Sequence, residues 1–411
     1  MSTKKKYDSR LIYVLTLFVC FLTIIFLLVY IAPFKFFSST QHEGISLVRD
    51  DQELRIYYNR ISYYFYHDIP YKDNRIEYPP LAVAYLTIPA FFTQEFDLYK
   101  FAFIAQNIIL TLLLVLVTYK LLVLFGRDEK WLWFFILPSI VYFLINRFDV
   151  LPAFLIQLSL FFLFKKQFTR SFIILSLAFL AKGYAIILFP IFFLYLLNHK
   201  DLPTVDLFKN RYLYILALPA IFITALIVIL AGLENGLFPY IFQSTRNFAH
   251  GAVYLIYIKS LQPILPVWLW EGGVKVAAKV LTLLQVALPL IVYIGYTFFR
   301  KFIRTREDVI NWSLLVILLY IQFSVYYSPQ WFVWLLPLLI LVIRRRREIW
   351  LIIFYDIMNY LHFPVVYNYA GPNSLLFDVV ILIRTILLII IILFIVQRII
   401  NRAKQVTRPA I

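Results

Sequence analysis

The carboxylates of this chain are concentrated in one segment. Residues 34–97 hold nine Asp and Glu side chains against six Lys and Arg, and they include the tyrosine-rich run "IYYNRISYYFYHD". Carboxylates accept protons and tyrosine hydroxyls donate and accept hydrogen bonds, so this segment could supply acid–base chemistry. The aromatic and apolar positions from Arg55 to Tyr66 also suit an amphipathic helix at a membrane surface. A tyrosine-rich surface helix with solvated charges is therefore the alternative interpretation.

Two prolines in the same segment mark the start of another helix. The sequence "RIEYPPLAVAYL" places Glu77 and Tyr78 directly before Pro79 and Pro80. Proline suits the first turn of a helix, where its missing N–H costs nothing. We expect a helix over residues 80–92, which is too short to cross a bilayer and should lie at the interface. Glu77 and Tyr78 would then be held at its N-terminus, over the helical bundle.

Several other kinds of chemistry lack the residues they need. The chain has ten glycines and no Gly-rich phosphate loop, which excludes ATP-driven pumping by this chain alone. Cys20 is the single cysteine, and no Cys/His cluster has the spacing of a zinc site. We therefore expect no cofactor and no metal ligand set, although a divalent metal is not excluded. The remaining classes are an enzyme acting on membrane or exterior substrates and a secondary transporter.

The elements that must position these residues are transmembrane helices. The 411 residues are 63% hydrophobic and 15% charged, too apolar for a soluble domain to cover. The formal charge of +17 lies in seven short basic clusters between apolar segments, because the rest of the chain holds 14 basic and 14 acidic residues. This is the positive-inside pattern, so we expect the clusters to be cytoplasmic and expect no binding to nucleic acid.

The apolar segments predict an all-α, multi-pass bundle of about twelve transmembrane helices in the cell membrane, with both termini cytoplasmic. The first span would be retained rather than cleaved as a signal peptide. Four of the segments are short for a bilayer, which is tolerated where their polar ends line a hydrated cavity. Residues 34–97 and 233–272 would form two long extracytoplasmic loops. The expected spans are 11–33, 98–125, 131–146, 149–165, 171–182, 184–198, 211–232, 273–299, 310–326, 330–343, 348–363 and 375–397.

Four motifs resemble those of one enzyme family. "IPYKDNRIEYPPLAVAYLTIP" is similar to the "PYrD…EYPPLa" signature of polyprenyl-phosphate-sugar-dependent glycosyltransferases of the GT-C superfamily, in particular the polyprenyl-phosphate-mannose-dependent mannosyltransferases. "NRFDVLPAFL", "LAFLAKGYAIILFP" and "YYSPQWFVWLLPLL" resemble the family's "R-x-D" link, "a-K-x-x-p-ll-P" hairpin and "SPQY…W..P" segment. The matches follow family order over about residues 50–340. We therefore divide the chain into a GT-C-like catalytic transmembrane module, residues 1–345, and C-terminal transmembrane helices of unassigned role, residues 346–411.

The resemblance implies a membrane hexosyltransferase whose active site is extracytoplasmic. Such an enzyme moves a hexose, here mannose by the resemblance, from a polyprenyl- or dolichyl-phosphate donor to a hydroxyl of a glycolipid or glycan acceptor. The donor is lipid-linked because nucleotide sugars are absent outside the cytoplasm. The family has two interfacial helices in a long loop after the first span. Its site supplies a carboxylate base for the acceptor hydroxyl and cations for the phosphate, and displacement inverts the sugar carbon.

Three acids in "RDDQELRIYY" compete for the role of this base. In the family it is an Asp shortly before a Tyr, ahead of the first interfacial helix. Counting back from Pro70 at the commonest family spacing reaches Glu53, and one or two inserted residues would move the role to Asp51 or Asp50. We favour Asp51, because the family residue is Asp and because Asp50 is expected to pair with Arg49. Glu53 could instead begin the helix, where a carboxylate favours the positive N-terminus.

The candidates for binding the donor phosphate are Lys182, Arg147, Arg246 and His250. Lys182 interrupts an apolar hairpin, where an ionisable group is costly enough to indicate function. A lysine that reaches out to the headgroups is the alternative. Arg246 and His250 lie in the second outer loop and could be ordinary surface residues. Arg147 could instead form a local ion pair with Asp149.

Glu77, Tyr78, Asp149 and Gln330 are the candidates for contact with the substrate. Gln330 lies in "SPQW", where a proline-bent helix start is an equally good interpretation.

Two charged residues lie near the middle of late spans. Asp356 and Arg384 could reach the same depth on adjacent antiparallel helices. A single charge at that depth costs at least about 2.5–3.5 kcal/mol on insertion scales, so we predict a structural ion pair between them.

Two other functions fit parts of this pattern. A secondary transporter or lipid-linked-sugar flippase would also have short broken helices and intramembrane charges, but it usually has two related halves. An enzyme that moves whole lipid-linked oligosaccharides would share the topology, and we would expect it to have a larger outer loop late in the chain.

Overall fold

The computed structural model describes residues 45–66, 68–73, 75–200, 211–244, 248, 251–264 and 266–407. Within these ranges the chain forms helices and no strand, with one isolated bridge between Ile45 and Asp50. Five of the helices are long and apolar enough to cross a membrane, or six if one bent pair is a single span. The predicted all-α membrane bundle is therefore confirmed. Its number of about twelve spans stays a prediction, and the first expected span, 11–33, lies outside the described residues.

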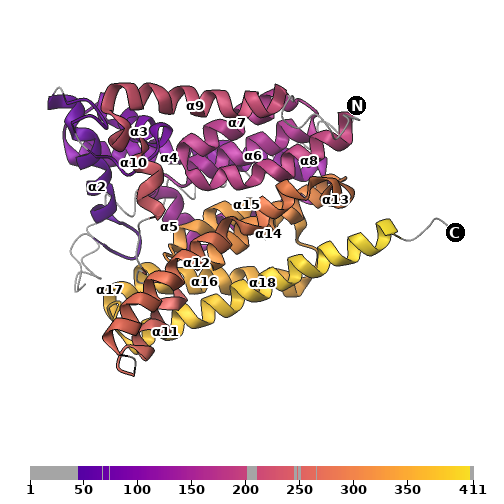
Figure 1. Cartoon of the computed structure of the whole chain (residues 1–411). Coiled ribbons are helices and arrows are strands. Elements are labelled where there is room, and N and C mark those ends of the chain that lie inside the picture. Colours follow the sequence, from indigo (N-terminus) through magenta and orange to yellow (C-terminus); the bar gives the residue numbers. More distant parts are fainter. Residues whose placement is uncertain are drawn as a thin grey trace.

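The helices lie in two groups along a common direction (Figure 1). One group follows the first half of the chain: α4 (Phe96–Leu124), α6 (Val150–Phe164), α7 (Phe168–Ala181), α8 (Phe189–Lys200) and α9 (Arg211–Ala231). The second group holds α12 (Val267–Ile294), α14 (Arg306–Gln322), α15 (Phe332–Val342), α16 (Arg346–Tyr360) and α18 (Leu375–Thr407). Every residue of α15 is buried and it packs on α6, so this helix is the shared core of the two groups.

The outward faces of several long helices are apolar. Only 11% of the span window is buried in α9 and in α12, whose exposed side chains include Phe222, Ile229, Leu283 and Ile294. Contiguous exposed apolar surface of this kind is expected where lipid replaces water as the solvent. The burial pattern therefore agrees with a bundle embedded in a bilayer.

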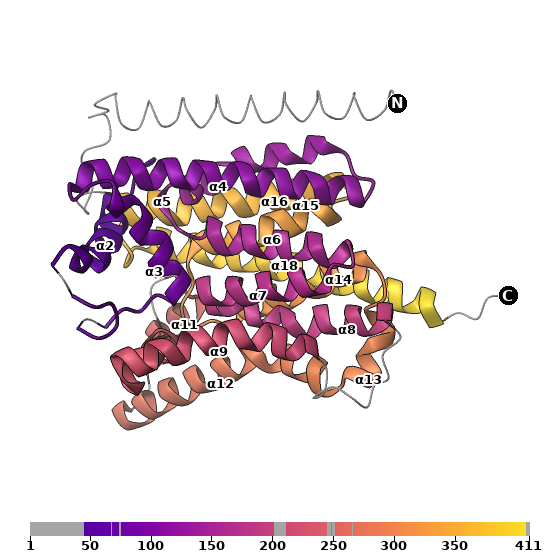
Figure 2. The same ribbon diagram turned by 90° about the horizontal axis from the view of Figure 1, so that it is seen from above.

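Two short helices lie at one end of the bundle (Figure 2). The helix α2 (Asp51–Ser62) continues into the turn η2 (Tyr63–Tyr66), and α3 (Pro80–Thr87) continues into η3 (Ile88–Phe91). Pro80 is the first residue of α3, and Pro79 before it is extended at φ −61° and ψ 159°. The helix start predicted from the two prolines is confirmed, and α2 contacts both α3 and α4.

Two tight hairpins bring polar residues to the same end. α5 (Pro138–Asn146) and α6 meet at an angle of 104°, with Arg147 to Asp149 between them. α7 and η5 (Gly183–Leu188) meet at Lys182, whose backbone is extended. The expected span 131–146 is divided at Pro138, because proline cannot donate the hydrogen bond that a continuous helix needs. Its first part is the separate short helix η4 (Glu129–Ile136).

Short segments complete the chain between these helices. The polar chain after α9 continues as α10 (Leu233–Ser244) and α11 (Val253–Leu261), and the chain after α12 as α13 (Tyr296–Phe299) and η7 (Arg300–Phe302). The short turn η8 (Pro329–Trp331) precedes α15, and η9 (Leu361–Val366) and α17 (Tyr367–Tyr369) follow α16. The C-terminal helices pack on the rest, since α16 contacts α5 and α18 contacts α14.

The predicted Asp356–Arg384 ion pair is wrong. Asp356 accepts hydrogen bonds from the Ser139 hydroxyl at 2.5 Å and from the backbone N–H groups of Ser139 and Ile140 at 3.3 Å each. The N-terminus of a helix carries partial positive charge, so α5 itself provides the compensation expected from arginine. Arg384 instead donates to the Gly251 carbonyl at 2.8 Å and lies over the ring of Tyr327.

Candidate functional site

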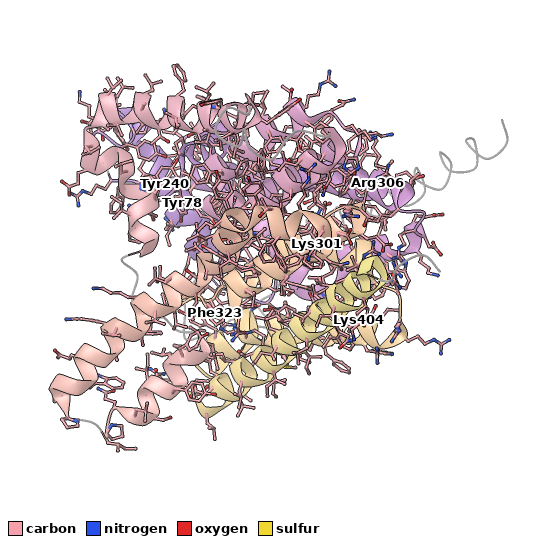
Figure 3. The ribbon with its side chains drawn as sticks, turned by 45° about the vertical axis from the view of Figure 1, so that its right-hand side comes forward. Tyr78, Tyr240, Lys301, Arg306, Phe323 and Lys404 are labelled. Atoms are coloured by element: carbon pink, nitrogen blue, oxygen red, sulfur yellow. The ribbon has the colours of Figure 1, made fainter. Side chains whose placement is uncertain are left out.

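A cavity of about 440 Å³ opens among the two short helices and the two hairpin tips. Its charged lining residues are Glu53, Glu77 and Lys182, and Gln330 adds an amide. Nine of its sixteen lining residues are aromatic. Figure 3 labels two of these, Tyr78 and Tyr240, which lie close together at this end of the molecule. A concave, mostly apolar pocket with a few polar groups is the usual form of a ligand site, and the volume is in the usual range.

The three clustered acids at the start of α2 face different surroundings. Asp50 precedes the helix and its carboxylate accepts the Glu53 backbone N–H at 3.1 Å, as an N-cap does. Asp51 forms ion pairs with Arg49 at 3.0 Å and Lys100 at 3.4 Å. Glu53 lines the cavity, whereas Asp50 and Asp51 do not. Helix rotation explains this, because two residues turn the chain by about 200°.

Arg147, between α5 and α6, connects the start of α2 to the turn η8. Its Nη2 lies 2.5 Å from an Asp50 carboxylate oxygen, its Nη1 lies 3.7 Å from Glu53, and its Nε donates to the Gln330 side-chain oxygen at 2.8 Å. Arg147 is not among the cavity-lining residues, so it positions the acids rather than facing a ligand. The expected partner of Asp50 was Arg49, and the structure pairs Asp50 with Arg147 instead.

The burial of Asp50 affects the ionisation of its carboxyl. Asp50 is 1% exposed, and burial raises the pKa of its carboxyl above the ordinary value. The positive charge of Arg147 is the largest influence in the opposite direction. A carboxylate in this position depends on its partner to stay ionised. The backbone N–H of Asp50 donates to the Asn146 side chain at 3.1 Å, which also fixes the chain entering α2 against α5.

The second charged pair joins Lys182 to Asp149. The Lys182 Nζ lies 2.5 Å from an oxygen of the completely buried Asp149, and the same oxygen accepts the Trp334 indole N–H at 2.7 Å. The ammonium also lies 4.9 Å from the ring centre of Phe148 and 4.8 Å from that of Trp334. Lys182 is therefore held at the cavity wall by α6 and α15, not extended along the surface of the bundle. The local Arg147–Asp149 pair considered above is replaced by two longer-range pairs.

Glu77 and Tyr78 both line the cavity at the entry to α3. Glu77 forms an ion pair with Arg60 of α2 at 2.9 Å, which ties the two short helices together. Tyr78 packs edge-to-face against Tyr57 and Phe148, with ring centres 5.7 and 5.5 Å apart. These contacts hold the start of α3 over the tip of the α5–α6 hairpin.

The predicted site residues therefore fall into three groups. Glu53, Glu77, Tyr78, Lys182 and Gln330 line one cavity, although they come from four separate parts of the sequence. Asp50, Arg147 and Asp149 hold that wall in place, and Asp51 faces Lys100. Arg246 and His250 lie outside the described residues.

Three contributors were missed from the sequence. Asn146 donates to the Val48 carbonyl at 3.0 Å, Trp334 binds Asp149, and Lys100 binds Asp51. Asn146 had a detectable signal, since it is the polar residue directly before Arg147 in "NRFD". Trp334 also had one, since it falls on the tryptophan of the "SPQY…W..P" resemblance, whereas Lys100 had none, because a lysine at a helix start is common in membrane proteins.

Within the described ranges, no group of three or more His, Cys, Asp or Glu side chains could hold a metal ion. Comparison with protein-family models and comparison with curated proteins each gave no match.

Proposed function

We propose that this chain is a membrane glycosyltransferase. It would transfer a hexose, mannose by the motif resemblance, from a polyprenyl- or dolichyl-phosphate donor to a hydroxyl of a glycolipid or glycan acceptor. The observation that carries the proposal is one cavity that combines Glu53 and Glu77 with Lys182, beside the helix that starts at Pro80. The four family-like motifs contribute residues to that cavity or to its supporting ion pairs.

In this proposal Glu53 is the general base. It removes the proton of the acceptor hydroxyl, and the oxygen attacks the anomeric carbon as the bond from that carbon to the phosphate oxygen breaks. The leaving group is the lipid phosphate, which needs little protonation. A single displacement of this kind inverts the anomeric centre. Two observations favour Glu53 over Asp51: Glu53 lines the cavity, and the commonest family spacing also reaches it.

Lys182 would bind the phosphate of the donor. A lysine ammonium has three donors, and the buried Asp149 orients it at the cavity wall. Charge that develops on a leaving phosphate is best stabilised by a cation fixed in place beforehand. The aromatic walls exclude water and give apolar surface for the lipid and the sugar faces. Gln330, whose oxygen accepts from Arg147, would place its amide toward the same space.

The location of the site follows from the charge pattern. We propose that the cavity opens at the extracytoplasmic face, because the basic clusters flank the other ends of the helices. The two short helices would lie at the membrane interface above it. The lipid-linked donor would enter from the bilayer. The acceptor would enter from the lipid surface or from the exterior.

A direct test uses the purified chain in detergent with a radiolabelled polyprenyl-phosphate hexose and a pool of membrane glycolipids. Transfer of label to an acceptor supports the glycosyltransferase. A secondary transporter or lipid-linked-sugar flippase would leave the sugar–phosphate bond intact, but it would move the labelled lipid between leaflets of a reconstituted vesicle. That second outcome, without transfer, contradicts the proposal.

A further inference from the structure

A second cavity, of about 330 Å³, lies near the other end of the bundle, among α14, α16 and α18. Figure 3 shows that Arg306, at the start of α14, and Lys404, near the end of α18, lie away from Tyr78 and Tyr240 of the first site. Six arginines line this cavity: Arg127, Arg344, Arg345, Arg347, Arg398 and Arg402. The lining acids are two, Glu307 and Glu348, and Asp308 beside the lining pairs with Arg402 at 2.6 Å, so the site keeps a surplus of three positive charges.

Ion pairs hold four of these six arginines in the cavity wall, including Arg127, whose guanidinium lies 3.9 Å from Glu307. Glu307 lies 2.6 Å from the Arg344 guanidinium and also pairs with Arg402. Glu348 lies 2.6 Å from Arg398. Guanidinium groups held in this way are already ordered. Binding an anion would therefore cost less arginine side-chain entropy.

The remaining arginines leave the positive charge unbalanced. Arg345 and Arg347 take part in no ion pair with a carboxylate of the described chain, and Arg347 lies over the Phe394 ring at 4.9 Å. Burial, followed by the positive charge of Arg344, lowers the pKa of Arg127. Burial and the neighbouring cation both disfavour the charged form of Arg127, and a bound anion would counteract them.

A small apolar crevice of about 30 Å³, too small to enclose an acyl chain, adjoins the arginine cavity. It is lined by Leu339, Ile343, Leu351, Ile352, Ile391 and Ile395 of α15, α16 and α18 and their flanks, and it shares Val342, Glu348, Phe394 and Arg398 with the cavity. Beside it, Ile389 and Leu393 of α18 are 42% and 61% exposed. The site therefore combines a cationic cavity with exposed apolar side chains on α18, one of the helices that line it.

We propose that this second cavity binds an anionic phospholipid, with the phosphate headgroup among the arginines and an acyl chain along the exposed apolar side chains of α18. Arginine forks match phosphate oxygens in geometry and charge, and basic pockets between transmembrane helices bind anionic headgroups. The exposed apolar side chains of α18, which also lines the cavity, favour a lipid over a free phosphate ion. The proposal does not depend on the glycosyltransferase assignment, because it involves neither the first cavity nor its residues.

The test measures lipid binding to the purified full-length protein by native mass spectrometry. The detergent-solubilised protein is titrated with phosphatidylglycerol and, separately, with phosphatidylcholine of the same acyl chains. We expect tighter binding of phosphatidylglycerol. Arg345→Gln and Arg347→Gln should each weaken its binding roughly 5-fold, as expected for one basic residue at an anionic membrane surface. Both side chains are exposed, so the variants should fold normally.

Arg346→Gln is the matched control. Arg346 lies between the two test residues and is exposed like them, but it does not line the cavity. Its substitution removes the same charge and should leave phosphatidylglycerol binding unchanged. Three results would overturn the proposal: equal affinity for the two lipids, an equal loss in the control, or displacement of the lipid by millimolar inorganic phosphate. The last would identify a phosphate site with no contribution from an acyl chain.

Discussion

Arg147 is the residue at which the charges of the first site converge. It contacts Asp50, Glu53 and Gln330 while its side chain is 8% exposed. Removing it would leave Asp50 buried without its counter-charge. Breaking a buried pair in this way typically costs about 3–5 kcal/mol, far more than the intact pair contributes. The arginine is thus expected to act on stability first, and on activity through the placement of Glu53.

This gives a prediction for stability. Arg147→Met should lower the thermal unfolding midpoint of the purified protein sharply, whereas Asp50→Asn should lower it less. Asparagine keeps the N-cap of α2 and removes only the charge. The double variant should therefore recover part of the loss seen in Arg147→Met. Midpoints that add without coupling in this cycle would show that the Asp50–Arg147 contact does not hold the site together.

Substitutions at Lys182 can distinguish a structural role of this residue from a functional one. We predict that Lys182→Gln abolishes most transfer and also destabilises the protein, because Asp149 is then buried without a cation. Adding Asp149→Asn should restore much of the stability and none of the transfer. The two readouts are the unfolding midpoint and the rate of label transfer. Recovery of both in the double variant would make Lys182 a purely structural residue.

Residue type and residue spacing gave different expectations for the base. The type argument favoured Asp51 and the spacing argument reached Glu53. The structure turns Asp51 toward Lys100 and Glu53 toward the cavity. The sequence does not determine which face of α2 packs on the bundle, because that rotation depends on Arg147 and Asn146, more than 90 residues later. The sequence therefore predicts that this segment lies at the cavity, but not which of its acids lines it.

The position of α5 is set by contacts with α16, a helix much later in the chain. Asp356 of α16 binds its first turn through two backbone N–H groups and the Ser139 hydroxyl, and α5 ends at Asn146, directly before Arg147. The C-terminal helices, which carry no family motif, therefore help to place the site.

We predict that Asp356→Leu lowers the free energy of unfolding by about 2–4 kcal/mol, since it removes a charge-assisted group of hydrogen bonds at a helix N-terminus. Ser139→Ala, which removes one of these bonds, should cost about 1 kcal/mol. Equilibrium unfolding in mixed micelles measures both. Equal stability of Asp356→Leu and the unmodified protein would contradict this anchoring role.

Local sequence patterns predicted where a helix begins, but not which residues its side chains contact. Pro79 and Pro80 fixed the start of α3 because proline constrains the backbone by itself. Equal depth suggested an Asp356–Arg384 pair, but depth leaves the rotation of each helix undetermined. In the fold Asp356 faces α5, and Arg384 faces Gly251 and Tyr327.

For the whole molecule, the two cavities lie toward opposite ends of the helices, the first beside acidic segments and the second among arginines. The positive-inside pattern predicts that the arginine end is cytoplasmic. Reporter tags near Asn198 and Arg345 should then read as cytoplasmic, and tags at Asn74 and Asn247 as extracytoplasmic. A cytoplasmic result at Asn74 would reverse the topology and place the first cavity on the wrong side for a flipped lipid donor.

The central claim is that Glu53 acts as a base in the first cavity, and one comparison tests it most directly. Glu53→Gln and Asp51→Asn each remove one charge from α2 and should leave donor binding nearly intact. We predict that Glu53→Gln lowers the transfer rate from the polyprenyl-phosphate hexose by about 10²–10⁴-fold, the usual contribution of a positioned base, while Asp51→Asn stays within about tenfold of the unmodified protein. Near-normal transfer by Glu53→Gln would contradict the account, and a large loss confined to Asp51→Asn would move the base to the opposite face of α2.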